Sequence, residues 1–514
     1  VELVPYLDAP AHVSFILKHP EYARLRAFPQ SNYEFSVMNP GTDSLLLRLF
    51  DELFAASKGG HYVLFSTDEG YYVGKAANDQ KEAESLGGAG ALYAKFITRI
   101  ANELHNRGRN VIFWGEYPLR PADVAALPSH LINGEYSSDF AGAFNKKGIR
   151  QMIYTYTQGE EPLFPSYYPF SSGNMKTDEE HDRASGRVPG MLKTVTGAVK
   201  EQKADPMGVI VAGWSDAGLH PETFWLGYAT GAATGWKQQG VTAGELAQRF
   251  YNSFYGAGAI ALDTAYRLLS RQAQFWDESW IWIPSTWRTP IFGNSERVYE
   301  KPVPALDQTL PLLPVPAADL SIKTSWGDSN AKRLVLARQF TKENDSVIAL
   351  LHQNIRNVAY NQYNLEVMLS VAQLCKQNLE FLLSLQLIDT LLHFSAAIAS
   401  QNPTVAVALL DQALDATEAL RRQRNETLHS LITVWYKDWY PRVAEANGRR
   451  FLDVLDDVKD HRPGRTVDMN YLLYRDLHYP LGTWAENVRT IRNAFAAKHG
   501  LPMRNERLNW EWVD

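Results

Sequence analysis

Short apolar runs that end in polar side chains recur along the first half of the chain. The run at residues 62–65 leads into the adjacent carboxylates Asp68 and Glu69 and then into a glycine. Short apolar stretches bounded by turn signals are typical of strands in a parallel sheet that is covered on both faces. Similar runs occupy residues 1–7, 110–116, 130–136, 150–156 and 208–216. The pattern therefore predicts six strands with polar residues at their carboxyl ends.

Helical patterns separate most of these runs. We expect helices at about residues 42–57, 92–107 and 188–203, and one that opens on the capping box Thr242-Ala-Gly-Glu245. Strands that alternate with helices indicate a parallel sheet. Polar and aromatic residues at successive strand ends favour a (β/α)8 TIM barrel, of which six strands are visible here. A doubly wound sheet would normally have a glycine-rich phosphate loop after its first strand, and this sequence has none.

The second half of the chain has an almost purely helical pattern. Apolar residues recur at helical spacing from about residue 331, and the last helix is expected to end near Lys498. This pattern predicts an all-α helical bundle of about five helices. The predicted domains are a TIM-barrel catalytic domain at residues 1–283, a proline-rich linker at 284–330, and a C-terminal α-helical domain at 331–514.

Composition narrows the classes of function. The 514 residues carry a formal net charge of −6, so the chain lacks the basic character of a nucleic-acid-binding protein. A single cysteine, Cys375, excludes an internal disulfide and a thiolate metal cluster. We find no run of 18 apolar residues and expect no membrane span. The chain opens on Val1 inside an expected strand, with no signal peptide, and we interpret it as a processed or truncated product.

Strand-end carboxylates together with strand-end tryptophans point to a glycoside hydrolase. Two carboxylates usually flank the scissile bond, and tryptophan rings stack on the apolar face of a sugar. Asp68 and Glu69 are adjacent, however, and neighbouring side chains on a strand point to opposite faces. They cannot act across one sugar ring unless the backbone turns between them. An adjacent pair suits a reaction in which a 2-acetamido group of the substrate attacks the anomeric carbon.

The sequence resembles the family 20 β-N-acetylhexosaminidases over about residues 1–255. Residues 5–12, Pro-Tyr-Leu-Asp-Ala-Pro-Ala-His, are similar to the family pattern Pro-Glu-x-Asp-x-Pro-Gly-His. Asp68-Glu69 resembles the end of the family signature His-x-Gly-Gly-Asp-Glu. Trp114-Gly-Glu116 and Trp214-Ser-Asp216 resemble the Trp-Asp-Glu and Trp-x-Glu strand ends of that family.

The resemblance implies catalytic roles for four residues. Glu69 would be the general acid and then the base that activates water. Asp68 would hold the acetamido nitrogen and stabilise the oxazolinium-like intermediate. Tyr156 would donate a hydrogen bond to the acetamido oxygen, and Tyr154 shares its strand face. His12 would lie near Glu69 and adjust its proton affinity.

The resemblance also implies a substrate pocket that needs no metal and no cofactor. Trp114 and Trp214 would form its walls, and Asp216 would bind sugar hydroxyls. Asp8 and Glu116 are further candidates for substrate binding, although Glu116 and Glu135 could equally form salt bridges in loops. The implied partner is a glycan that contains N-acetylhexosamine. That substrate makes a secreted or periplasmic location the expectation.

The chain departs from the family pattern at several positions. Leu64, Ser66 and Thr67 stand where the family has His, Gly and Gly, and Asp216 is one methylene shorter than the usual glutamate. The family also has two barrel strands before the strand of Asp8, so an upstream segment or another chain would supply them. The helical domain could complete the pocket, form a homodimer, or cover the underside of the barrel.

Two other functions remain open from the sequence. Glu69 could work with Glu116 or Asp216 as a conventional acid and nucleophile on a sugar that has no acetamido group. Alternatively, the chain could be a catalytically inactive barrel that binds glycans while the helical domain engages a partner.

Overall fold

The fold is seen in a computed structural model of the chain. The described residues are 1–135, 138–158, 163–169, 186–201, 206–214, 220–237, 240–280, 312–438, 445–446, 449–450 and 481–506. Several predicted features lie partly or wholly outside them, among them Asp216, residues 284–311 of the proline-rich linker, and residues 451–480 and 507–514 of the C-terminal helical domain.

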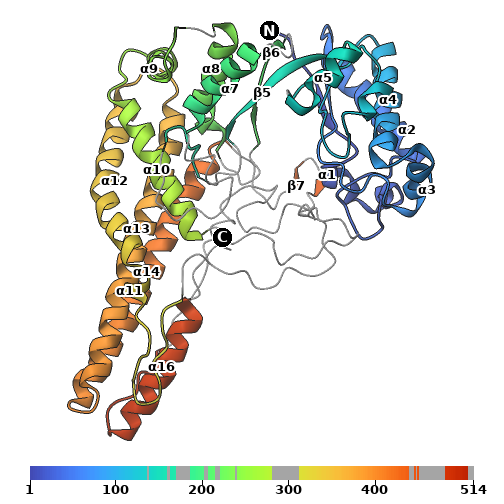
Figure 1. Cartoon of the computed structure of the whole chain (residues 1–514). Helices are drawn as coiled ribbons and strands as arrows, with labels where there is room; N and C mark the ends of the chain where they lie inside the picture. The colour runs from blue at the N-terminus through green and yellow to red at the C-terminus, as the bar shows by residue number, and fades with distance from the viewer. Residues whose placement is uncertain are drawn as a thin grey trace.

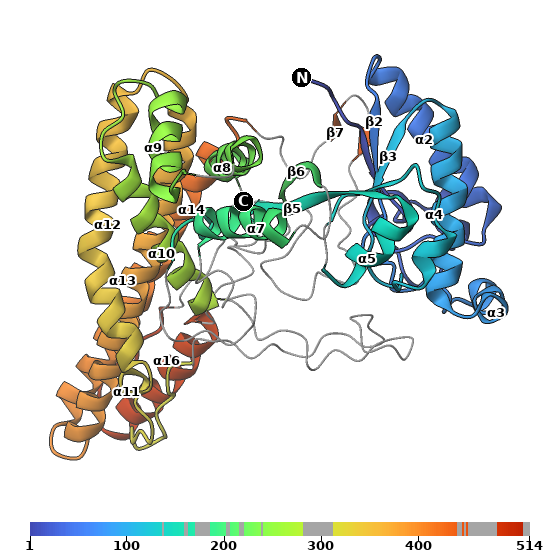
Figure 2. The ribbon, with the colours of Figure 1, turned by 45° about the horizontal axis from the view of Figure 1, so that its top comes forward.

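A parallel sheet of six strands, curled into a half-barrel, forms the first part of the molecule (Figures 1 and 2). The strands lie in the sheet in chain order, and β1 and β6 are its edges within the described residues. Their bounds are β1 Tyr6–Asp8, β2 Tyr62–Ser66, β3 Asn110–Phe113, β4 Ile132–Asn133, β5 Arg150–Gln158 and β6 Pro206–Gly213. The predicted fold, an α/β barrel with six visible strands followed by a helical domain, is confirmed.

The register of the strands brings their carboxyl ends to one edge of the sheet. Asp8 lies beside Ser66, Phe65 beside Phe113, and Phe113 beside Asn133. Residues that follow these positions in the chain therefore emerge close together. This edge is where parallel α/β barrels carry their chemistry.

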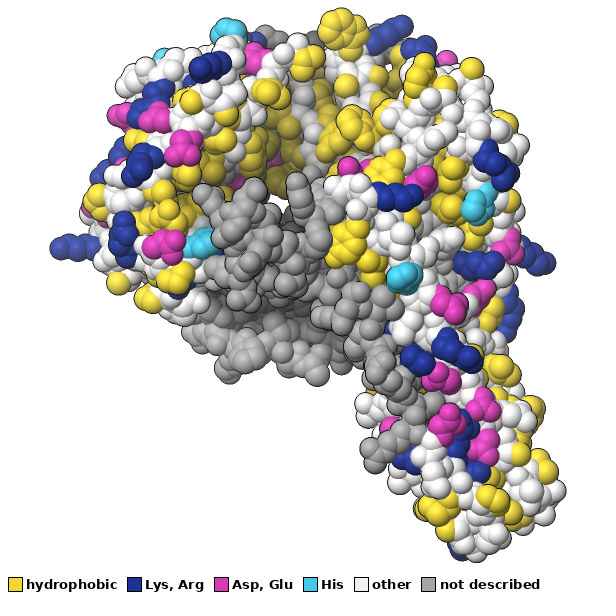
Figure 3. Space-filling model, turned by 180° about the vertical axis from the view of Figure 1, so that it is seen from behind, with side chains coloured by type: hydrophobic (Ala, Val, Ile, Leu, Met, Phe, Trp, Pro, Cys, Tyr) yellow, Lys and Arg dark blue, Asp and Glu magenta, His cyan; other side chains and the backbone are white. Residues whose placement is uncertain are grey.

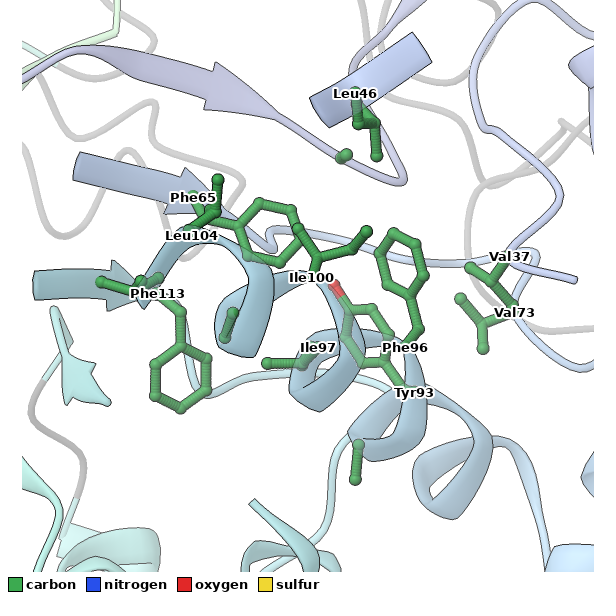
Figure 4. Close-up of a cluster of buried hydrophobic side chains, with 14 of the residues drawn as sticks. Val37, Leu46, Phe65, Val73, Tyr93, Phe96, Ile97, Ile100, Leu104 and Phe113 are labelled. Atoms are coloured by element: carbon green, nitrogen blue, oxygen red, sulfur yellow. The ribbon is translucent and has the colours of Figure 1, made fainter. Parts of the chain in front are cut away.

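Helices cover the outer face of the half-barrel (Figure 2). Aromatic and aliphatic side chains on α4, among them Tyr93, Phe96 and Ile100, pack near Phe65 and Phe113 of the strands (Figure 4). Helix α4 ends just before Gly108, which adopts a left-handed backbone with φ of 80°. The helices of this part are α1 Ser14–Leu17, α2 Pro40–Ala56, α3 Ala77–Leu86, α4 Ala89–Asn106, α5 Ser138–Lys147, α7 Arg187–Glu201 and α8 Trp225–Trp236, with short 3-10 turns at Pro20–Leu25, Asp123–Ala126 and Pro221–Thr223.

A bundle of long helices extends from one side of the half-barrel (Figure 1). Its last helix ends at Lys498, and the capping box of Thr242 and Glu245 is present at the start of α9, as predicted. The helices are α9 Ala243–Phe254, α10 Leu262–Trp280, α11 Trp326–Ser329, α12 Ala331–Asn357, α13 Gln362–Ile398, α14 Pro403–Trp435 and α16 Leu481–Lys498; the short strands β7 Glu445–Ala446 and β8 Arg449–Arg450 pair with each other.

One hydrophobic cluster crosses from the half-barrel into the bundle. Leu226 of α8 and Tyr266 of α10 belong to the same buried cluster as Leu365 of α13 and Leu428 of α14. Helix α10, which precedes the predicted linker, packs against α12 and α13, which follow it. The two parts therefore share a core.

The central helix of the bundle, α13, is long and apolar enough to cross a membrane, judged by length and composition only. We expected no membrane span because the sequence has no uninterrupted run of 18 apolar residues. In α13, polar residues separate the apolar ones, so no such run is present there. Core helices of globular proteins pass the same test, and α13 lies between α12 and α14.

Candidate active site

The carboxyl ends of the six strands place most of the predicted site residues together. Asp8 ends β1, Asp68 and Glu69 follow β2, Glu116 follows β3, and Trp214 follows β6. Figure 3 shows a hollow between the two halves of the molecule that is lined mainly by hydrophobic side chains. Asp216 is the one predicted site residue outside the described part of the chain.

The backbone turns at the carboxylate doublet. Glu69 has a left-handed backbone with φ of 45°, which breaks the alternation of an extended strand. As a result, both carboxylates face His12: its Nε2 lies 3.6 Å from Asp68 Oδ2 and 3.3 Å from Glu69 Oε2. The backbone turn therefore lets two adjacent carboxylates share one site.

A buried tyrosine, Tyr33, contacts both His12 and the backbone of Glu69. Tyr33 is fully buried, and its hydroxyl donates to the backbone carbonyl of Glu69 at 3.0 Å and lies 3.3 Å from Nε2 of His12. Asp8 is close enough to interact electrostatically with His12: burial raises the pKa of Asp8, and the charge of His12 lowers it. A hydrogen bond of 2.5 Å from the hydroxyl of Tyr6 also lowers the pKa of Asp8.

Ser66 and Thr67, at the carboxyl end of β2, have defined contacts. The hydroxyl of Ser66 accepts from the indole N–H of Trp114 at 3.0 Å and from Tyr6 at 3.2 Å. The hydroxyl of Thr67 accepts from the backbone N–H of Trp114 at 3.0 Å and donates to its carbonyl at 2.7 Å. Ser66 and Thr67 therefore hold Trp114 in place beside the doublet.

Glu116 binds the doublet directly. Its Oε1 accepts the backbone N–H of Glu69 at 2.7 Å. Burial raises the pKa of Glu116 well above its usual value, and a hydrogen bond with Asp68 and the charge of Asp68 raise it further. Glu135 follows β4, and burial together with the charge of Asp68 raises its pKa to about 7. Both carboxyl groups therefore favour their protonated forms more strongly than ordinary glutamates do.

Aromatic side chains form the other side of the site. The rings of Trp114 and Tyr154 lie 5.3 Å apart in an edge-to-face arrangement, and the indole N–H of Trp214 donates to the hydroxyl of Tyr154. The ring centroids of Tyr154 and Tyr156 lie 6.0 Å apart, and the guanidinium carbon of Arg187 lies 4.3 Å from the ring centroid of Tyr156. Tyr154 is thus the tyrosine that contacts both predicted pocket tryptophans. Tyr156 contacts Tyr154 on the same strand face.

Sequence reasoning missed three residues that hold the site. Tyr33 comes from a loop without a periodic pattern, so no local signal identified it. Asn133 accepts a hydrogen bond from the backbone N–H of Gly115 at 2.9 Å. It is a polar residue at the end of β4, and this position could have identified it as a site residue. Tyr6 lies on the same strand face as Asp8, so the alternation of side chains along the strand could have identified it too. Within the described part of the chain, no group of three or more His, Cys, Asp or Glu residues could hold a metal ion.

Comparison with known proteins gives distant structural matches. No protein-family model and no curated protein sequence matches the chain. A β-N-acetylhexosaminidase from Bacteroides fragilis is 18% identical over 48% of this chain and 51% of its own, with a TM-score of 0.36. A Flavobacterium johnsoniae chitobiase is 16% identical over 80% and 62%, with a TM-score of 0.36. A GH138 enzyme targeting pectin rhamnogalacturonan II is 11% identical over 96% and 77%, with a TM-score of 0.39.

The matched regions are partial. They cover 51% of the Bacteroides fragilis structure and 62% of the Flavobacterium johnsoniae structure. These matched chains are glycoside hydrolases by description, and likeness at this level assigns neither a substrate nor a reaction to this chain.

Proposed function

We propose that the protein is a retaining exo-β-N-acetylhexosaminidase that uses the 2-acetamido group of its substrate as the nucleophile. The observation that carries this proposal is the convergence of Asp68 and Glu69 on Nε2 of His12, at 3.6 Å and 3.3 Å. Two carboxylates that contact the same nitrogen face the same space although they are adjacent in sequence. An adjacent pair that faces one substrate suits a reaction in which the substrate supplies the nucleophile.

The other carboxyl groups are poorly suited to be a conventional nucleophile. Glu116 is bound to the Glu69 backbone and to Asp68, and its raised pKa favours the neutral acid, which is a weak nucleophile. Glu135 has a pKa of about 7, so a substantial fraction is protonated at neutral pH. A nucleophile supplied by the substrate removes the need for either group.

The proposed reaction has two steps. Glu69 donates its proton to the glycosidic oxygen while the acetamido oxygen attacks the anomeric carbon, so the leaving group departs as an alcohol. Asp68 accepts a hydrogen bond from the acetamido N–H and stabilises the positive charge of the cyclised ring. Glu69, now a carboxylate, then takes a proton from water, whose oxygen attacks the anomeric carbon and reopens the ring. Tyr154 or Tyr156 would donate to the acetamido oxygen.

The test is hydrolysis of 4-nitrophenyl N-acetyl-β-D-glucosaminide beside the plain β-glucoside, for wild type and Glu69→Gln. We expect cleavage of the acetamido sugar alone, with kcat reduced about 10³-fold in the variant, chiefly because Glu69 no longer activates water in the second step. A thiazoline mimic of the cyclised intermediate should inhibit strongly.

Other outcomes would replace the proposal. Turnover of the plain glucoside at a comparable rate would exclude substrate assistance and favour a conventional pair that includes Glu116 or Asp216. Glycan binding with no turnover of either sugar, unaffected by Glu69→Gln beyond a few-fold, would favour a binding protein.

A further inference from the structure

A row of three tyrosines leads from the doublet to the surface. The rings of Tyr33 and Tyr71 are stacked with centroids 6.0 Å apart, and Tyr117 lies 6.0 Å beyond Tyr71. Their exposed fractions rise outward, from 0% for Tyr33 to 7% for Tyr71 and 38% for Tyr117. The outermost ring therefore presents an aromatic surface to solvent.

A lysine stands at the outer end of this row. The Nζ of Lys75 donates to the hydroxyl of Tyr117 at 3.2 Å and lies 5.6 Å from the centre of its ring. An aromatic face next to a cation is a suitable surface for an anionic sugar.

The row begins at the catalytic loops. Tyr71 is two residues after Glu69, and its backbone N–H donates to the Glu69 carbonyl at 2.7 Å. Tyr117 directly follows Glu116, which binds the Glu69 backbone. Under the proposed function, Glu69 faces the glycosidic oxygen, and we place the leaving group on the side of the loops that carry Tyr71 and Tyr117.

The two sides of the site differ in the charge of their side chains. The terminal sugar would lie among Asp8, Asp68, Glu69 and Glu116, where an anionic group would be repelled. Lys75 provides a cation outside this cluster, beside an exposed ring. An anionic group on the substrate is therefore better accommodated beside Lys75 than among these carboxyl groups.

We propose that Tyr117 and Lys75 form a binding subsite for an anionic sugar, so that the substrate is an N-acetylhexosamine β-linked to a uronic acid or a sulfated sugar. This inference rests on the proposed function for the placement of the scissile bond. It adds the chemical class of the leaving group, which the doublet alone does not define.

The experiment compares three substrates that share the same terminal sugar. They are N-acetylglucosamine β-linked to glucuronic acid, to glucose, and to 6-sulfated N-acetylglucosamine. We expect wild type to prefer an anionic substrate over the neutral one by about tenfold in kcat/KM, which corresponds to one charge-assisted contact. The uronate and sulfate substrates distinguish the two sources of charge. High salt should reduce the preference because the subsite is partly exposed.

Variants assign the preference to residues. Lys75→Gln should reduce the ratio of anionic to neutral kcat/KM to about one, and Tyr117→Ala should raise KM for all three disaccharides. Lys95→Gln is the matched control, since Lys95 pairs with Glu82 at 2.6 Å on the outer helices, and it should leave the ratio unchanged. Equal rates on anionic and neutral substrates in wild type, or an unchanged ratio in Lys75→Gln, would overturn the subsite.

Failure of the proposed function gives a different result. If 4-nitrophenyl N-acetyl-β-D-glucosaminide is not cleaved, calorimetric titration with the same three disaccharides replaces kinetics. Tighter binding of an anionic disaccharide that is lost in Lys75→Gln would support the subsite without the reaction. Equal binding of charged and neutral disaccharides would refute it.

Discussion

At the scale of single residues, the site depends on backbone conformations that ordinary side chains avoid. Glu69 and His12 both have positive φ values, 45° and 57°, in a region that non-glycine residues rarely occupy. Such conformations cost of order 1 kcal/mol each and persist where surrounding contacts hold them. Tyr33 and Glu116 supply these contacts to Glu69, through its carbonyl and its N–H. These backbone conformations allow the adjacent carboxylates of Asp68 and Glu69 to face the same group.

Glu116 should tolerate an amide better than truncation. In Glu116→Gln the side-chain oxygen can still accept the Glu69 N–H, and the NH2 group can donate to Asp68 as the protonated acid does. We expect kcat within about threefold of wild type for the glutamine variant and a loss of about 10²-fold for Glu116→Ala, which leaves buried groups unpaired. Steady-state kinetics on the aryl glycoside would measure both. A glutamine variant as poor as the alanine variant would show that ionised Glu116 is needed.

Glu135 should make stability depend on pH. Its pKa rises from 4.5 to about 7 on folding, so the folded state binds more protons between these values. The free energy of unfolding should therefore be greatest below the lower value and fall as pH rises through about 7. Glu135→Gln should remove this loss, with a gain at pH 8 of up to about 3 kcal/mol and little change near pH 4.5. Urea denaturation at the two pH values would test this; an equal gain at both would contradict it.

At the scale of elements, local signals predicted the strands and most helices well. An apolar run followed by acids is visible in the sequence, so β2 and its doublet could be placed. The helix expected from about residue 42 begins two residues earlier, because Asn39 caps α2 by accepting the N–H of Gly41 at 2.9 Å, and Pro40 is the first helical residue. The role of Tyr33 could not be predicted, because it depends on packing between segments far apart in the chain.

Gly115 is required for close packing between strand ends. A Cβ at this position would lie 2.5 Å from Cζ of Phe144 and 2.9 Å from Oδ1 of Asn133. Gly115→Ala should therefore lower the free energy of unfolding by about 1–3 kcal/mol and displace the neighbouring Glu116. Gly197→Ala in α7 is the control, because nothing lies within 4 Å of its Cβ; it should be neutral or stabilising by up to about 1 kcal/mol. Thermal denaturation would compare them, and equal effects would rule out a steric cause.

At the scale of the whole molecule, the half-barrel and the bundle are distinct in shape and continuous in their core. Sequence composition placed a boundary between them at the proline-rich segment, because periodicity reports the type of element and not the partner it packs against. The cluster that joins Tyr266 of α10 to Leu365 of α13 and Leu428 of α14 needs apolar residues from both sides of that boundary. The bundle therefore contributes directly to burying the helices that support β5 and β6.

This shared core has a consequence for how such chains are inherited. A recombination event that exchanged the bundle for another domain would expose the apolar face of α8, and the half-barrel would have to acquire new surface residues at the same time. Substitutions on either side of the contact must also be matched on the other. The two parts should consequently be transmitted through a lineage as one unit.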